Sequence, residues 1–172
     1  RQMAGSPFPA SWFQSLNAIF IVTFAPVFAW LWMTLGDRQP SAPTKFAIGL
    51  IGVGLSFVIL VPPARAAIGG ALASPLWLVV VYLVQTYAEL CLSPVGLSSM
   101  TKLAPARIQG SMMGVWFLGA SVGNFLAGQT ATFYESMPLA TLFGTVSVMP
   151  IIAGIVMLLM RKKFTAMMGT VR

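Results

Sequence analysis

Five apolar stretches alternate with short segments rich in Pro, Gly and charged residues along this chain of 172 residues. The stretches cover residues 13–35, 45–61, 76–100, 111–132 and 139–160, the second being the shortest. About twenty apolar residues in a helix cross the hydrocarbon core of a bilayer. The pattern therefore predicts five transmembrane helices, joined by linkers at 36–44, 62–75, 101–110 and 133–138 and followed by a tail at 161–172.

The composition supports a membrane protein. The chain is 58% hydrophobic and 8% charged, whereas soluble domains carry about 25% charged residues. It contains no His and one Cys, Cys91, which excludes an internal disulfide and the usual side-chain sets for zinc, haem or iron-sulfur. We therefore expect an all-α integral membrane fold without a metal or cofactor.

The basic residues indicate an orientation. Eight of the ten Lys and Arg fall on one side of the predicted spans: Arg38, Lys45, Lys102, Arg107, Arg161, Lys162, Lys163 and Arg172. By the positive-inside rule that side is cytoplasmic, which places the first residues outside and the tail 161–172 inside. Because the bases do not cluster on a soluble face, we expect a lipid bilayer and no nucleic acid as partner. The chain starts at Arg1 and is interpreted as a piece of a longer protein, with an odd number of helices preceding it.

A carboxylate interrupts the third apolar stretch. Glu89 at mid-membrane would cost about 3 kcal/mol without compensation. At 100° per residue, a polar stripe falls within an arc of about 80°: Tyr82, Gln85, Thr86, Glu89, Ser93 and Gly96. The stripe indicates a hydrated cavity, where the Ser93 hydroxyl can donate to Glu89 or share a ligand with it. The alternative is a structural acid, protonated or paired, that joins two helices.

Two further side chains have two interpretations each. Asn17 lies near the outer end of the first stretch, and Asn in a membrane helix more often forms an interhelical hydrogen bond than a ligand contact. Trp116 lies in the cytoplasmic half of the fourth stretch, where Trp commonly belongs to the interfacial belt. Its depth also suits the wall of a cavity.

Several blocks together resemble the proton-dependent oligopeptide transporters of the major facilitator superfamily. The blocks follow one another in order: WFQSLN at 12–17, APVFAWLW at 25–32, PSAPTKFAIG at 40–49, ELCLSPVGL at 89–97, TKLAPAR at 101–107 and MMGVWFL at 112–118. The resemblance extends to about Met160. It implies that the five spans are helices eight to twelve of a twelve-helix carrier and form most of its C-terminal six-helix bundle.

The resemblance also implies roles for four residues. Glu89 matches the carboxylate that meets the amino terminus of the peptide, and Ser93 matches the hydroxyl one turn below it. Asn17 resembles the Asn that hydrogen-bonds the peptide backbone, and Trp116 resembles a Trp that lines the pocket. No catalytic residue or enzyme activity is implied.

The implied function is proton-coupled symport of di- and tripeptides by alternating access, with the proton as coupling ion and no other cofactor. The implied partners are small peptides, protons, the bilayer and the N-terminal helices of the same transporter, and the expected location is a bacterial inner membrane. Two alternatives remain open. One is a related carrier for nitrate, a drug or a metabolite, and the other is a membrane scaffold that transports nothing.

Overall fold

The computed structural model describes residues 2–3, 6–7, 11–68, 70, 74–134 and 136–168. Five long helices form the bundle: α1 (Ser11–Leu35), α2 (Ala42–Ile68), α3 (Leu76–Leu103), α4 (Gln109–Ala131) and α5 (Leu139–Met168). The short elements are β1 (Gln2–Met3), β2 (Ser6–Pro7), η1 (Gly36–Arg38), η2 (Ala106–Ile108) and η3 (Thr132–Tyr134). The two strands form only a two-residue antiparallel pair, and the predicted all-α fold is confirmed.

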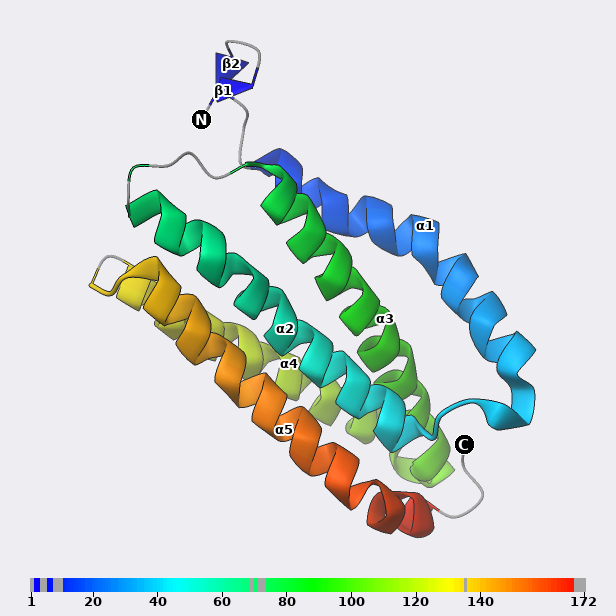
Figure 1. Cartoon of the computed structure of the whole chain (residues 1–172). Helices are drawn as coiled ribbons and strands as arrows, with labels where there is room; N and C mark the ends of the chain where they lie inside the picture. Colours follow the sequence, from blue (N-terminus) through cyan, green and yellow to red (C-terminus); the bar gives the residue numbers. More distant parts are fainter. Residues whose placement is uncertain are drawn as a thin grey trace.

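The helices pack as a bundle around α2 and α3. Figure 1 shows α2 and α5 side by side, α3 between α1 and α2, and α4 behind α2 and α5 in this view. Glycines allow α2 and α5 to touch, because a Cβ added at Gly54 would lie 2.9 Å from the Ser147 carbonyl oxygen. A Cβ at Gly154 would lie 2.9 Å from the Ala47 carbonyl oxygen. Small residues at such crossings let backbones approach closely and gain dispersion contacts that larger side chains would prevent.

Four of the described helices, α1, α2, α3 and α5, are long and apolar enough to cross a membrane. The fifth expected span corresponds to α4, whose 23 residues would extend about 35 Å at 1.5 Å per residue. Its sequence contains Gly, Ser, Asn and Gln among the apolar residues. None of its residues is buried. A Cβ added at Gly119 or Gly123 would meet nothing within 4 Å. That face of α4 therefore has no partner helix within the described part of the chain.

Two boundaries differ most from the sequence-based expectation. The second helix continues beyond residue 61 to Ile68 and contains Pro62 and Pro63, so the linker expected at 62–75 begins later. A proline φ of about −65° fits a helix, although each proline removes one backbone hydrogen bond. Pro63 and Ala64 are buried, so packing holds this segment helical. The expected tail is helical as far as Met168, and residues 169–172 lie outside the described residues.

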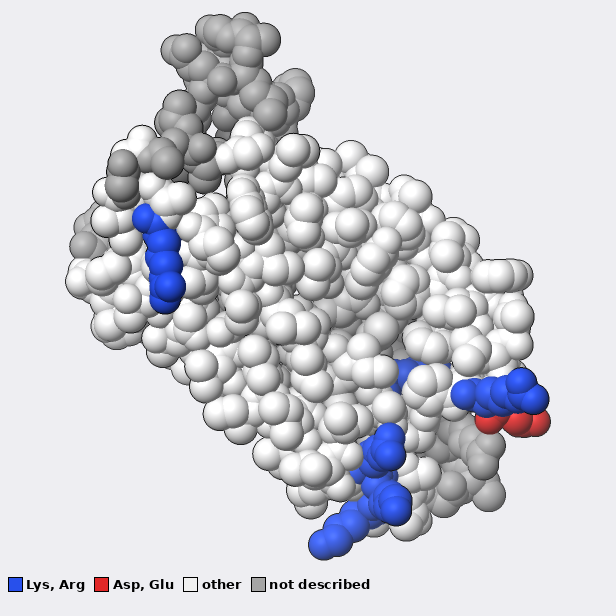
Figure 2. Space-filling view, viewed as in Figure 1, with Lys and Arg blue, Asp and Glu red and all other residues white. Residues whose placement is uncertain are grey.

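Charged side chains gather at one end of the bundle, where α1, α3 and α5 end and α2 and α4 begin. Figure 2 shows blue side chains grouped at this end and another near the opposite end. We call it the basic end and define it by its exposed bases: Arg38, Lys102, Arg107, Arg161, Lys162 and Lys163. Lys45 belongs to the same end but is only 9% exposed.

Candidate functional site

Glu89 lies near the middle of α3 and is half-buried. The Asn17 side chain of α1 reaches it across the helix contact, and Asn17 Nδ2 donates a hydrogen bond to Glu89 Oε2 at 3.3 Å. These residues are 72 positions apart in the sequence. The structure thus brings together two of the four predicted site residues, at the point where α1 meets α3.

The other end of the Asn17 amide contacts Thr86, whose side chain is fully buried. Thr86 Oγ1 lies 2.8 Å from the Tyr82 carbonyl oxygen and 3.3 Å from Asn17 Oδ1. A hydroxyl has a single proton, so the closer carbonyl is its stronger acceptor. The Asn17 amide therefore donates from its NH₂ group to the Glu89 carboxylate, and its oxygen lies beside the Thr86 hydroxyl. This arrangement matches the interhelical interpretation of Asn17 and also fixes its position beside Glu89.

The polar stripe changes environment along α3. Thr86 faces the helix contact, Glu89 is half-buried, and Ser93 is exposed. Ser93 donates no hydrogen bond to Glu89 among the bonds of the described residues, so direct donation is not seen. The two groups share one helix face about one turn apart, which still allows both to contact a single ligand.

Trp116 of α4 packs against α3 and α2. Its ring covers Gly96, where an added Cβ would lie 2.9 Å from Trp116 Cζ2. The Phe46 ring of α2 meets it edge-on, with centroids 6.2 Å apart and planes at 79°. Gly96 follows Glu89 by two turns on the same stripe, about 10.5 Å along the axis. Trp116 therefore borders one end of the stripe as a half-buried packing residue.

An aromatic cluster between α1 and α3 was not predicted from the sequence. The Tyr87 ring contacts Phe24 edge-on at a centroid distance of 5.0 Å and Phe28 at 5.6 Å. Such pairs stabilise a contact by about 0.5–1.5 kcal/mol beyond their buried area. The cluster holds α1 against α3 next to the Asn17–Glu89 hydrogen bond. The cluster could have been predicted from the spacing of Phe20, Phe24 and Phe28, which places them along one face of α1.

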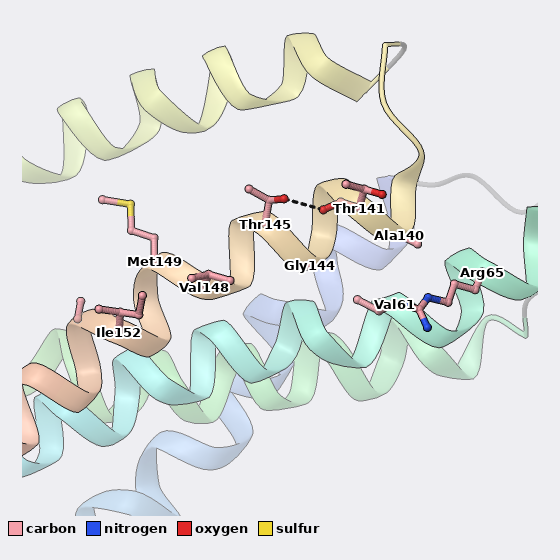
Figure 3. Close-up of a pocket in the computed structure, with 10 residues that line it drawn as sticks. Val61, Arg65, Ala140, Thr141, Gly144, Thr145, Val148, Met149 and Ile152 are labelled. Carbon is pink, nitrogen blue, oxygen red and sulfur yellow. Dashed lines mark hydrogen bonds between the residues drawn. The ribbon is translucent and has the colours of Figure 1, made fainter.

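A pocket with a volume of about 800 Å³ lies between the end of α2 and the start of α5. Figure 3 shows Arg65 at one end and Met149 pointing away from α2. Its lining is mostly aliphatic, and the Thr145 hydroxyl already donates to the Thr141 carbonyl oxygen at 2.9 Å. None of the four predicted site residues lines it, and we assign it no ligand.

Comparison with known proteins assigns the chain to a protein family. The sequence profile of the POT family matches residues 1–149. The uncharacterized transporter YclF of Bacillus subtilis is 49% identical over 92% of this chain and 32% of its own length. A di-/tripeptide transporter of Lactococcus lactis is 41% identical over 94% of this chain and 33% of its own length.

Solved structures give the same result. A crystal structure of the peptide transporter POT in complex with sulfate has a TM-score of 0.85 and 43% identity, covering 94% of this chain and 32% of that protein. A POT family transporter in complex with 5-aminolevulinic acid has a TM-score of 0.84 and 30% identity, covering 96% and 34% respectively. The chain spans about a third of the length of these relatives. Because profile, sequences and structures agree over most of its length, this multi-pass membrane chain belongs to the POT family.

Proposed function

We propose that this chain is the C-terminal portion of a proton-coupled di- and tripeptide symporter and supplies helices eight to twelve of the transporter. Relatives with 41–42% identity are named as peptide or di-/tripeptide transporters, which supports the substrate class. In this proposal the basic end is cytoplasmic, since exposed Lys and Arg there follow the positive-inside rule. The protein then belongs in a bacterial inner membrane.

The observation that carries the proposal is the half-buried carboxylate of Glu89, held by Asn17 on a polar face of an otherwise apolar helix. A carboxylate at bilayer depth is retained where it pairs, titrates or binds a ligand. The ammonium group at the amino terminus of a peptide is a suitable counter-ion. A proton is the other group that can remove the charge.

The neighbouring residues have complementary roles in this proposal. Asn17 orients the carboxylate and offers amide groups to a peptide backbone, while the exposed Ser93 hydroxyl can contact the same ligand. Trp116 closes one end of the stripe with an apolar wall. Because backbone and termini are common to all short peptides, such a site would accept many side chains.

The coupling step follows from the Asn17–Glu89 contact. In the present amide orientation Asn17 donates to the carboxylate, and hydrogen bonds to a charged group contribute about 1.5–3 kcal/mol. Pairing of Glu89 with a peptide ammonium weakens this bond and leaves the Asn17 amide free to contact the peptide backbone. Alternating access then proceeds as a rocking of two helical bundles about a central site.

The uncovered face of α4 also fits a larger assembly. A Cβ added at Gly119 or Gly123 would meet nothing within 4 Å, and small residues of this kind suit close helix packing. We propose that helices outside this chain cover that face in the intact transporter.

The test is Glu89→Gln in the intact transporter, reconstituted in vesicles with dipeptide-driven proton uptake as the readout. Asp37→Asn is the matched control, because it makes the same carboxylate-to-amide change in the exposed η1 segment. We expect Glu89→Gln to abolish coupled uptake and Asp37→Asn to preserve it. Coupled transport at the wild-type rate by Glu89→Gln would refute the assignment.

The alternative substrates can be separated in the same vesicles. Unlabelled dipeptide should compete with labelled dialanine uptake, whereas nitrate, free amino acids and dyes should not. Competition by nitrate or dye alone would favour a related carrier for another substrate. A scaffold would show neither uptake nor a substrate-induced thermal shift.

A further inference from the structure

Lys45 is a buried cation at the basic end, in the first turn of α2. Its ammonium donates a hydrogen bond from Nζ to Gln39 Oε1 at 2.8 Å and lies 4.3 Å from the centroid of the Trp32 ring. Both partners are neutral. The side chain is 9% exposed, so solvent contributes little to the stabilisation of its charge.

Lys45 forms no salt bridge within the part of the chain that the structure describes. Among the described residues, the titratable groups that act on it are the Cys91 thiol and the Lys102 ammonium, and neither is a carboxylate. A helix N-terminus carries a partial positive charge and favours acidic groups. A lysine in that first turn therefore adds positive charge to a region that already favours an anion.

A pocket adjoins this cation. It has a volume of about 270 Å³ and lies between the basic-end halves of α1, α2 and α3. Lys45, Ser98 and Ser99 are the polar residues that line it, together with Trp32, while Phe28, Val95 and their neighbours form apolar walls. The pocket thus combines a cation and hydroxyl groups with a surface suited to hydrocarbon.

This pocket is separate from the Glu89 site. Ser98 follows Glu89 by nine residues, which at 100° per residue places it about 180° away around α3. Asn17, Glu89, Ser93 and Trp116 are not among the residues that line the pocket. An occupant here therefore does not compete for the polar stripe.

We propose that this pocket binds the phosphate headgroup of an anionic phospholipid from the leaflet at the basic end, with Lys45 as its cationic contact. Basic pockets between transmembrane helices bind lipid headgroups in this way. The phosphate receives the Lys45 charge and hydrogen bonds from Ser98 or Ser99, and an acyl chain follows the apolar walls. The bound lipid links α1, α2 and α3 at this end of the bundle.

The experiment uses the intact transporter, reconstituted in phosphatidylcholine vesicles with or without phosphatidylglycerol. Native mass spectrometry then measures the phosphatidylglycerol that is retained on extraction. We expect Lys45→Gln to lower retention about fivefold, the factor that corresponds to one basic residue's attraction at a membrane surface. Lys45→Arg should keep it. Ser98→Leu, which fills the pocket and leaves Lys45 in place, should lose it, and this variant decides the question if Lys45→Gln does not fold.

Lys163→Gln is the matched control, since it removes one positive charge from the exposed surface of the same end. It should retain phosphatidylglycerol as the wild type does. The proposal would be overturned if Lys45→Gln retained as much phosphatidylglycerol as the wild type. It would also be overturned if Lys163→Gln lost as much phosphatidylglycerol as Lys45→Gln, because that result indicates general attraction to the charged surface. In a separate experiment, inorganic phosphate is added at the same concentration as phosphatidylglycerol. Displacement of the lipid by phosphate would assign the site to the free anion instead.

Discussion

Replacing Gly54 by Ala would place a methyl group where α2 meets α5. The new Cβ would lie 2.9 Å from the Ser147 carbonyl oxygen and in closer conflict with the Ile151 side chain. Ordinary C···O contacts lie at about 3.3–3.6 Å, so the two helices must separate by roughly half an ångström. A backbone carbonyl within a helix cannot rotate away, and the displacement falls on the whole interface.

The magnitude follows from the lost contacts. A gap of about 0.5 Å forfeits roughly a quarter of the dispersion energy of a contact, and each heavy-atom pair contributes about 0.1–0.2 kcal/mol. Over the tens of atom pairs at a helix crossing, the loss reaches about 1–3 kcal/mol. This agrees with the usual cost of inserting a methyl group into a packed core.

Thermal unfolding of the intact transporter in detergent is the assay, with Gly144→Ala as the matched control. Gly144 lies on α5, and a Cβ there would meet nothing within 4 Å. We expect a lower unfolding midpoint for Gly54→Ala. Gly144→Ala should leave the midpoint unchanged or raise it slightly, because Ala stabilises a helix interior by about 0.5–1 kcal/mol relative to Gly. An unchanged midpoint in Gly54→Ala would refute the described packing of α2 against α5.

Further substitutions test the site and its surroundings. Asn17→Leu removes the donor to Glu89 and should raise the KM for dialanine at least roughly tenfold, the equivalent of one hydrogen bond to a charged group; an unchanged KM would show that the contact is dispensable. Gly96→Ala should displace the Trp116 ring and weaken dipeptide binding in a titration, while the added change Trp116→Phe should restore part of it. Phe24→Ala should lower the unfolding midpoint by the loss of about 0.5–1.5 kcal/mol of aromatic pairing and leave the dialanine KM near its wild-type value; a raised KM would place Phe24 in the substrate site.

The helices themselves could be predicted because apolar length depends only on local sequence. The end of α2 could not, since Pro62 and Pro63 are local signals for a turn, whereas the burial of Pro63 and Ala64 favours a helix. The sequence likewise placed Lys45 at the start of the second span, among the bases of the predicted cytoplasmic side. Only the arrangement of α1, α2 and α3 reveals that its side chain is buried.

The candidate site could be proposed from the sequence as a set of residues but not as a geometry. The period of α3 identifies the polar stripe around Glu89 from the sequence alone. That Asn17 reaches this carboxylate, and that Thr86 holds the other end of the same amide, depends on how α1 crosses α3. Trp116 could be placed at a depth in the membrane, yet its contact with Gly96 required the position of α4.

The central claim is that the polar face of α3 lines a water-filled, peptide-binding cavity. Its most direct measurement is the reaction of Ser93→Cys with a membrane-impermeant thiol reagent, in the intact transporter with every cysteine except Cys91 replaced. Ser93 is exposed and Cys91 is buried, so we predict that the introduced thiol reacts, that Cys91 does not, and that dialanine slows the reaction. A thiol at position 93 that is inert, or that reacts equally fast with and without dialanine, would contradict the account.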